Sequence, residues 1–369
     1  MASLQLYPKL ITDALMNVRY PGTGKNIIEE GLLADDLRID GMKVTFSLQF
    51  PKERDPFAAS LVKACEMAIL TYVSPEVEIK GNISTIFAPA KNQVDPENPL
   101  PGVKNIIAIH SGKGGVGKST ISANLAVALA NLGYKVGLLD ADIFGPSMPK
   151  MFNLEDASPV ADENGKIVPE ERYGVKLLSI GFFVNPEDAT MWRGGMASNA
   201  LRQLITEGAW GELDYFLIDL PPGTSDIHLT TIQTLGITGV VVVSTPQPVA
   251  LADARKGISM FMNEKVNVPI LGLVENMAWF TPAELPNNKY YIFGKDGCKN
   301  LAEELNVNLL GQIPIVQSIR EGGDEGHPVA CDGNTMTGLA FTQLAANVVS
   351  ATNYRNENLA ATQRVHTHK

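Results

Sequence analysis

The chain has 369 residues, 45% of them hydrophobic and 19% charged, which suggests two or three globular domains at roughly 150 residues each. Its 40 acidic and 30 basic side chains give a formal net charge of −10, which argues against broad electrostatic binding to nucleic acid or to an anionic membrane. Three cysteines far apart in sequence, no secretory signal and no apolar run of about 18 residues indicate a cytoplasmic protein that binds proteins or small molecules.

Residues 1–86 predict a small α+β domain. Apolar residues recur at helical spacing in residues 7–18 and again in residues 57–73. Residues 37–50 predict a hairpin that turns at Asp40 and Gly41, and a further short strand is expected at residues 77–79. The next segment, residues 87–102, contains four prolines and few apolar side chains, so we expect a linker between domains.

Short apolar runs alternate with helical segments in residues 103–353. This pattern is typical of a mostly parallel sheet covered by helices on both faces, an α/β fold that binds ligands at the carboxyl ends of its strands. The expected strands are residues 106–109, 136–139, 175–180, 216–218, 240–243, 270–274 and 309–313. The polar residues 354–369 are expected to form a flexible tail.

A glycine-rich loop follows the first of these strands. The segment HSGKGGVGKST, residues 110–120, satisfies G-x-x-x-x-G-K-[ST], and an apolar helix is expected at residues 121–132. In such a loop the backbone N–H groups face phosphates, Lys118 neutralises phosphate charge and Ser119 gives an oxygen to Mg²⁺. The expected nucleotide-binding residues of the loop are Gly112, Gly114, Gly115, Val116, Gly117, Lys118, Ser119 and Thr120.

Two other strands end in carboxylates. Asp140 and Asp142 leave the second strand, where one can order an attacking water while the other supports a Mg²⁺ shell; an Asx-type turn before Gly-Pro is an equally good interpretation. Asp219 ends the strand at residues 216–218, as a Mg²⁺-holding acid does, and the Pro-Pro-Gly that follows fits a switch segment. We therefore expect three strand ends to meet at one phosphate site.

Lys113 gives the loop the form KGGVGKST, which resembles the deviant Walker A motif of the MinD, ParA and nitrogenase-iron-protein ATPases. With LLDADIFGPS, MWRGGM, DLPPGTSD, VENMAWF, IFGKDG and LLGQIPI, nearly the whole chain resembles the Mrp/ApbC-type P-loop ATPases, which carry iron–sulfur clusters. The front domain is similar to the small iron–sulfur-assembly domain often fused ahead of them. The resemblance implies an ATP-binding and hydrolysing homodimer that works with apo iron–sulfur proteins and assembly factors.

The resemblance also implies roles for single residues. Lys113 would reach the nucleotide of the partner subunit, Lys118 and Asp142 would act in catalysis with Asp142 orienting the water, and Asn276 would read the adenine. Ser119 and Asp219 would hold Mg²⁺. Arg193 would pin a neighbouring loop or subunit, with a surface salt bridge as the alternative interpretation.

The sequence departs from the family at the cluster site. The family places a Cys-x-x-Cys pair just after the position of Phe280, where thiolates from two subunits hold a bridging [4Fe-4S] cluster. Residues 281–293 contain no cysteine, although thiolates are the usual ligands of such a cluster. Cys298 is a candidate ligand if Cys331 or an external thiol completes the site; alternatively both are ordinary half-buried residues. A MinD/ParA-like ATP-dependent interaction switch without a cluster is the alternative function.

Overall fold

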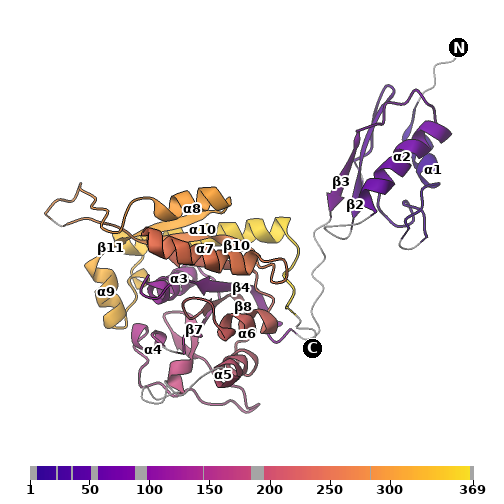
Figure 1. Ribbon diagram of the computed structural model, residues 1–369. Helices are drawn as coiled ribbons and strands as arrows, with labels where there is room; N and C mark the ends of the chain where they lie inside the picture. Colours follow the sequence, from indigo (N-terminus) through magenta and orange to yellow (C-terminus); the bar gives the residue numbers. More distant parts are fainter. Residues whose placement is uncertain are drawn as a thin grey trace. The chain divides into compact units, whose positions relative to one another are not determined.

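The computed structural model describes residues 6–21, 24–34, 36–50, 57–87, 98–143, 145–183, 195–282 and 284–365 (Figure 1). The chain divides into two compact units, Met1–Gln93 with Asn358–Ala360, and Val94–Glu357 with Ala361–Lys369. Each unit is described by itself. Of the predicted linker, residues 88–97 lie outside the described residues. No helix in the described ranges is long and apolar enough to cross a bilayer.

The small unit packs two helices against one face of a three-stranded sheet of order β1-β2-β3. Its elements are α1 (Pro8–Leu15), β1 (Arg38–Asp40), β2 (Lys43–Phe50), α2 (Ala58–Tyr72) and β3 (Ile83–Phe87). The antiparallel β1–β2 pair confirms the predicted hairpin, and α1 and α2 confirm the two helices. Val44, Phe46, Leu48 and Phe50 alternate along β2 and are all buried, because successive side chains of a strand point to opposite faces.

The third strand lies later in the chain than the sequence predicted. Residues 77–79 form only an isolated bridge, Lys43 to Glu78, although Val77 and Ile79 are buried in the core. The strand proper is β3, which pairs in parallel with β2 after the crossover through α2. The two buried side chains of residues 77–79 therefore anchor a turn, and the expectation of a strand there was wrong.

The large unit is built on an eight-stranded sheet of order β11-β10-β9-β4-β8-β5-β7-β6. All neighbouring strands run parallel except β6 and β7, which confirms the predicted mostly parallel sheet and adds one antiparallel edge strand. The strands are β4 (Val103–His110), β5 (Val136–Asp140), β6 (Glu170–Arg172), β7 (Val175–Ser179), β8 (Leu213–Asp219), β9 (Gly239–Ser244), β10 (Ile270–Phe280) and β11 (Leu309–Ile315).

Helices cover both faces of this sheet. Ile106 and Ala108 of β4 face one apolar core and the alternate residues Ile107 and Ile109 face the other, which is why the central strands read as continuous apolar runs. The helical elements are α3 (Lys118–Asn131), α4 (Met148–Met151), η1 (Ile180–Phe182), α5 (Gly195–Thr206), α6 (Asp226–Thr234), α7 (Pro248–Met262), α8 (Gly297–Leu305), α9 (Gln317–Asp324), η3 (Val329–Cys331) and α10 (Met336–Asn358).

The C-terminal segment is packed over most of its length, contrary to the flexible tail predicted from residue 354. Helix α10 continues to Asn358, because Ala351, Thr352 and Arg355 extend its buried stripe while the polar residues between them face outward. Beyond the helix, the Thr362 hydroxyl accepts a hydrogen bond from Arg355 and the Val365 amide donates to the carbonyl of Ile232. Only residues 366–369 lie outside the described part of this segment.

Candidate functional site

The glycine-rich loop connects the end of β4 to the first turn of α3. Gly115 and Gly117 have φ values of +81° and +84°, a left-handed conformation that glycine adopts without steric cost. Gly112 is required for a different reason, since a Cβ at this position would lie 2.2 Å from the carbonyl carbon of Asp253 in α7. The loop therefore takes a compact shape in front of the N-terminus of α3, where backbone N–H groups and the helix dipole favour an anion.

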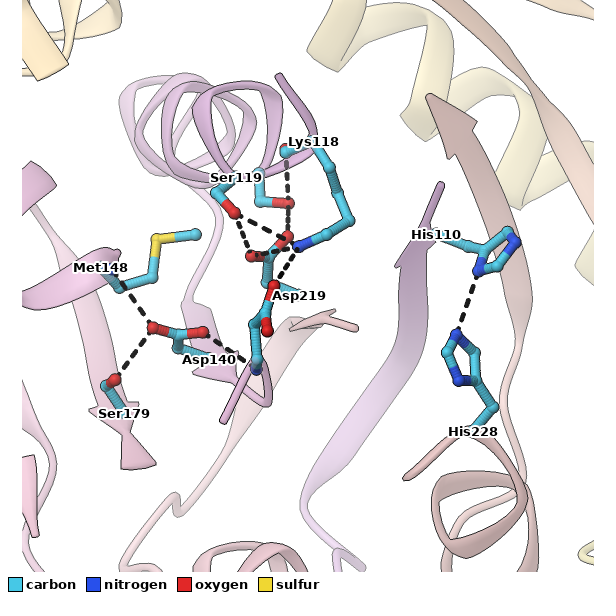
Figure 2. Close-up of polar contacts among 10 residues, drawn as sticks. His110, Lys118, Ser119, Asp140, Met148, Ser179, Asp219 and His228 are labelled. Carbon is cyan, nitrogen blue, oxygen red and sulfur yellow. Dashed lines mark hydrogen bonds and ion pairs between the residues drawn. The ribbon is translucent and has the colours of Figure 1, made fainter. Parts of the chain in front are cut away.

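A buried carboxylate holds the loop lysine (Figure 2). Asp219 at the end of β8 is fully buried, and its Oδ2 lies 2.7 Å from Nζ of Lys118 and accepts a hydrogen bond of 2.7 Å from the Ser119 hydroxyl. Lys118 Nζ also lies 3.2 Å from the Ser119 Oγ. The Asp219 carboxylate and the Ser119 hydroxyl are hard oxygen donors side by side, a set that fits Mg²⁺, which binds few protein ligands and keeps several waters.

Ser122 completes this cluster and was missed by the sequence analysis. Its hydroxyl donates to Oδ1 of Asp219 over 2.5 Å, so both carboxylate oxygens of Asp219 have partners. The signal was available in the spacing, because Ser122 follows Ser119 by three residues and residues at i and i+3 share one face of a helix.

The two carboxylates that follow β5 occupy different environments. Asp142 is near the cluster, with its Oδ2 4.0 Å from Lys118 Nζ and 14% of its side chain exposed. Asp140 is fully buried and accepts hydrogen bonds from the Ser179 hydroxyl and from the backbone amides of Met148 and Asp142. The bond from the amide of Asp142 is the Asx-type turn, so Asp140 holds the loop in shape, and its support of a Mg²⁺ shell stays a prediction.

Burial raises the pKa of Asp140 to about 7, and the neighbouring Asp219 carboxylate acts in the same direction. The two residues are register partners on the adjacent strands β5 and β8, so their carboxyl groups share one water-excluded region. Lys118 lowers the pKa of Asp140 by its positive charge, and the Ser179 and Met148 donors also lower it, but burial outweighs them. Asp140 therefore keeps its proton to a higher pH than an ordinary carboxyl group does.

Asn276 contacts the phosphate loop in this structure. Its Nδ2 donates to the carbonyl of Val116 over 2.8 Å, and a Cβ at Gly117 would lie 2.2 Å from the same nitrogen. Asn276 is buried at the carboxyl-terminal half of β10, two strands from β4 in the sheet. The carboxamide thus supports the backbone of the loop, while its reading of adenine stays a prediction.

The other predicted residues lie at the edge of the site or outside it. Lys113 is exposed on the loop, and Thr120 is in the first turn of α3, where its carbonyl accepts a hydrogen bond from Asn124. Arg193 lies outside the described residues. Within the described ranges no group of three or more His, Cys, Asp or Glu side chains could hold a metal ion.

The structure encloses Cys298, the candidate cluster ligand, in an apolar core of the large unit. The residue lies in the first turn of α8 and is fully buried, and its sulfur lies 3.9 Å from the carbonyl of Thr245. Its amide donates to the buried Glu275 carboxylate, and burial followed by that negative charge raises the pKa of the thiol. Burial also raises the pKa of half-buried Cys331 to about 11. Both thiols are therefore protonated at neutral pH when no metal is bound, and Cys298 is in addition enclosed by the core.

Two family descriptions match the chain. The one described as NUBPL iron-transfer P-loop NTPase covers residues 102–349, and the one described as iron-sulfur cluster assembly protein covers residues 9–80. An iron-sulfur cluster carrier protein from Synechocystis sp. is 41% identical over 348 residues, 92% of this chain and 97% of the relative. The iron-sulfur protein required for NADH dehydrogenase in mitochondria of Arabidopsis thaliana is 48% identical over 261 residues, 70% of this chain and 82% of the relative.

Solved structures share the fold of the large unit. A nucleotide-binding protein in complex with ADP from Archaeoglobus fulgidus is 37% identical with a TM-score of 0.58, over 68% of this chain and 98% of that chain. The cell division ATPase MinD of Pyrococcus furiosus is 25% identical with a TM-score of 0.51, over 67% of this chain and 98% of that chain. These similarities confirm the predicted P-loop NTPase fold.

The raised pKa of Asp140 predicts a pH dependence of stability in the nucleotide-free protein. From about pH 4 to about pH 7 the folded protein keeps a proton that the unfolded chain has released, so the free energy of unfolding falls as pH rises through this window. We expect Asp140→Asn to flatten this fall and the exposed control Asp156→Asn to leave it unchanged. Urea unfolding at several pH values measures the slope. The same slope in Asp140→Asn and wild type would contradict the assignment.

Proposed function

The chain belongs to the family of NUBPL iron-transfer P-loop NTPases, and from this premise we propose that it binds and hydrolyses ATP with Mg²⁺ as a homodimer in iron–sulfur cluster assembly or delivery. The membership confirms the resemblance predicted from the motifs. The observation that carries the proposal is the cluster of Lys118, Ser119 and Asp219, which lies where the glycine-rich loop meets α3. The front unit, which matches an iron–sulfur assembly family, supports the same setting.

Lys118 and Asp219 would change partners when the nucleotide binds. Without nucleotide, Lys118 is neutralised by Asp219 at 2.7 Å. A bound polyphosphate would compete for Lys118, and Ser119 and Asp219 would then hold Mg²⁺, which would neutralise charge on the phosphate oxygens. Because a buried charge without a partner is costly, neither Lys118 nor Asp219 can lose its partner without gaining another. The site therefore favours nucleotide and Mg²⁺ together.

Asp142 would orient the attacking water. Its carboxylate leaves the end of β5 beside Lys118 and stays partly exposed, whereas Asp140 is enclosed and already hydrogen-bonded. Lys113 would meet the nucleotide of the partner subunit, since it projects from the exposed part of the loop, and Asn276 would read the adenine. In this arrangement a second subunit completes the positive charge around the transferred phosphoryl group.

The chain's own cysteines do not fit a cluster in the way the family pattern predicts. The segment after Phe280 has no thiol, Cys298 is enclosed in the core, and Cys65 is buried in the other unit. An iron–sulfur cluster would therefore be cargo whose thiolates come largely from an apoprotein, an assembly factor or a small thiol. The lack of a thiol in the segment after Phe280 also favours a second candidate function, an ATP-dependent interaction switch of the MinD/ParA kind that binds no cluster.

Lys118→Ala tests the phosphate loop. We expect it to lower kcat/KM for ATP hydrolysis by about 100-fold or more, because it removes the charge that meets the phosphates. Lys135→Ala, an exposed lysine of the same unit, serves as the control and should hydrolyse ATP like wild type. Steady-state phosphate release measures both. Wild-type turnover in Lys118→Ala would show that the loop is not the nucleotide site.

Anaerobic reconstitution tests the cluster assignment. With iron and sulfide but no added thiol ligand, we expect wild type and Cys298→Ala to retain the same, near-zero, iron and sulfide per protomer, because Cys298 is enclosed. Addition of glutathione or of a thiol-bearing assembly factor should raise retention equally in both proteins. A cluster bound to wild type that is lost in Cys298→Ala would contradict the proposal and restore Cys298 as a ligand.

A further inference from the structure

Two buried histidines face each other beside the phosphate loop (Figure 2). His110 is the last residue of β4, directly before the loop, and His228 lies in the first turn of α6, which follows the Pro-Pro-Gly that was predicted to be a switch. Both side chains are fully buried in the large unit. Burial of two polar rings in an otherwise apolar core costs free energy unless the rings make hydrogen bonds.

The hydrogen bonds of the pair run in one direction. The backbone amide of Ser225 donates to Nδ1 of His228 over 3.1 Å, so the neutral His228 ring carries its proton on Nε2. That Nε2 lies 3.2 Å from Nδ1 of His110, which accepts the bond. Burial lowers the pKa of His228 to about 4 and that of His110 to about 3, so both rings are neutral at pH 7. The chain Ser225 to His228 to His110 is thus fixed in tautomer and direction.

The backbone of the switch segment, residues 220–228, is hydrogen-bonded to the end of β4 and to the residue that follows it. The amide of Leu220 donates to the carbonyl of Ile109 over 3.1 Å, and the amide of Gly223 donates to the carbonyl of Ser111 over 2.9 Å. The hydrogen bond between His228 and His110 adds a third link at the far end of the segment, where α6 begins. Hydrogen bonds from three positions of the switch segment, which starts directly after Asp219, therefore hold it to residues 109–111 at the start of the phosphate loop.

The space around His110 is shaped to hold its ring. A Cβ at Gly257 of α7 would lie 2.0 Å from Nε2 of His110, so the ring occupies room that only a glycine leaves. Phe261, one helical turn further along α7, packs edge-on against the His110 ring with centroids 5.3 Å apart. Nε2 of His110 has no hydrogen-bond partner among the described residues, so the contact with His228 is the one polar bond found there for this ring.

We propose that His228 is a positioning residue which, through its hydrogen bond to His110, couples the switch segment 220–228 to the phosphate loop during nucleotide turnover. The inference rests on the proposed ATPase function. Among the described residues His228 forms no hydrogen bond or ion pair with Lys118, Ser119 or Asp219, and the Lys118 charge acts on it only by lowering its pKa. The direct link from His228 to the strand before the loop is its hydrogen bond to His110. A rearrangement of the switch segment on phosphate binding or release then moves the start of the loop with it.

Two substitutions separate this coupling from a local role in capping α6. In His228→Gln the side-chain nitrogen takes the place of Nε2 and can still donate to His110, but the acceptor for the Ser225 amide is lost. In His228→Asn the side-chain oxygen takes the place of Nδ1 and still accepts from Ser225, but the donor to His110 is lost. Gly257→Ala perturbs the pair from the other side without changing either histidine.

The experiment measures kcat and KM for ATP hydrolysis, with thermal melting to confirm folding, in these three variants. We expect His228→Asn and Gly257→Ala to lower kcat by about tenfold with KM changed less than about threefold, and His228→Gln to stay within about threefold of wild type in both. Hydrogen exchange should show ATP-dependent protection of residues 109–117 and 220–228 together in wild type and His228→Gln, and of residues 109–117 alone in His228→Asn.

Other outcomes overturn the proposal. If His228→Asn keeps wild-type kcat while His228→Gln loses it, the histidine only caps α6. If both keep wild-type kcat and joint protection, the two segments are not coupled through the pair. A wild-type protein that hydrolyses no ATP would overturn the proposed function and this inference with it, whereas an active wild type with an unaffected His228→Asn would overturn this inference alone.

Discussion

The ion pair between Lys118 and Asp219 is the interaction on which the rest of the site depends. Asp219 is fully buried at a strand end, and a buried carboxylate is tolerated only where a charge and hydrogen bonds compensate it. Lys118 supplies the charge at 2.7 Å, and the Ser119 and Ser122 hydroxyls supply the bonds. The partners that satisfy Asp219 in the free protein are thus the groups that a nucleotide and Mg²⁺ would use, which links binding to the stability of the site.

The order of the sheet brings these groups together from distant parts of the sequence. Strands β4, β8 and β5 are neighbours, so the loop after β4, Asp219 after β8 and Asp142 after β5 meet at one edge. The same order encloses Asp140 and places it beside Asp219, so burial first and the neighbouring carboxylate second raise its pKa. The order of the strands therefore explains the assembly of the site and contributes to the raised pKa of Asp140.

The sequence predicted those features of the site that depend on local pattern. The loop, the apolar run into Asp219 and the parallel strands follow from residue types at fixed spacing, which is why they could be recognised. The histidine pair depends on two residues 118 positions apart that only the fold brings together, and no spacing rule indicates them. The packed C-terminal segment and the burial of Cys298 were missed for a similar reason, because polar composition and a turn-like context do not show which tertiary contacts will cover a segment.

The central claim is that Asp219 holds Lys118 in the free protein and releases it when Mg²⁺ and nucleotide bind. Equilibrium binding of a non-hydrolysable ATP analogue, measured with and without Mg²⁺ in wild type and Asp219→Asn, tests it most directly. The account predicts that Mg²⁺ strengthens binding strongly in wild type, and that Asp219→Asn loses this gain while binding the metal-free analogue as well as wild type or better. An undiminished gain from Mg²⁺ in Asp219→Asn would contradict it.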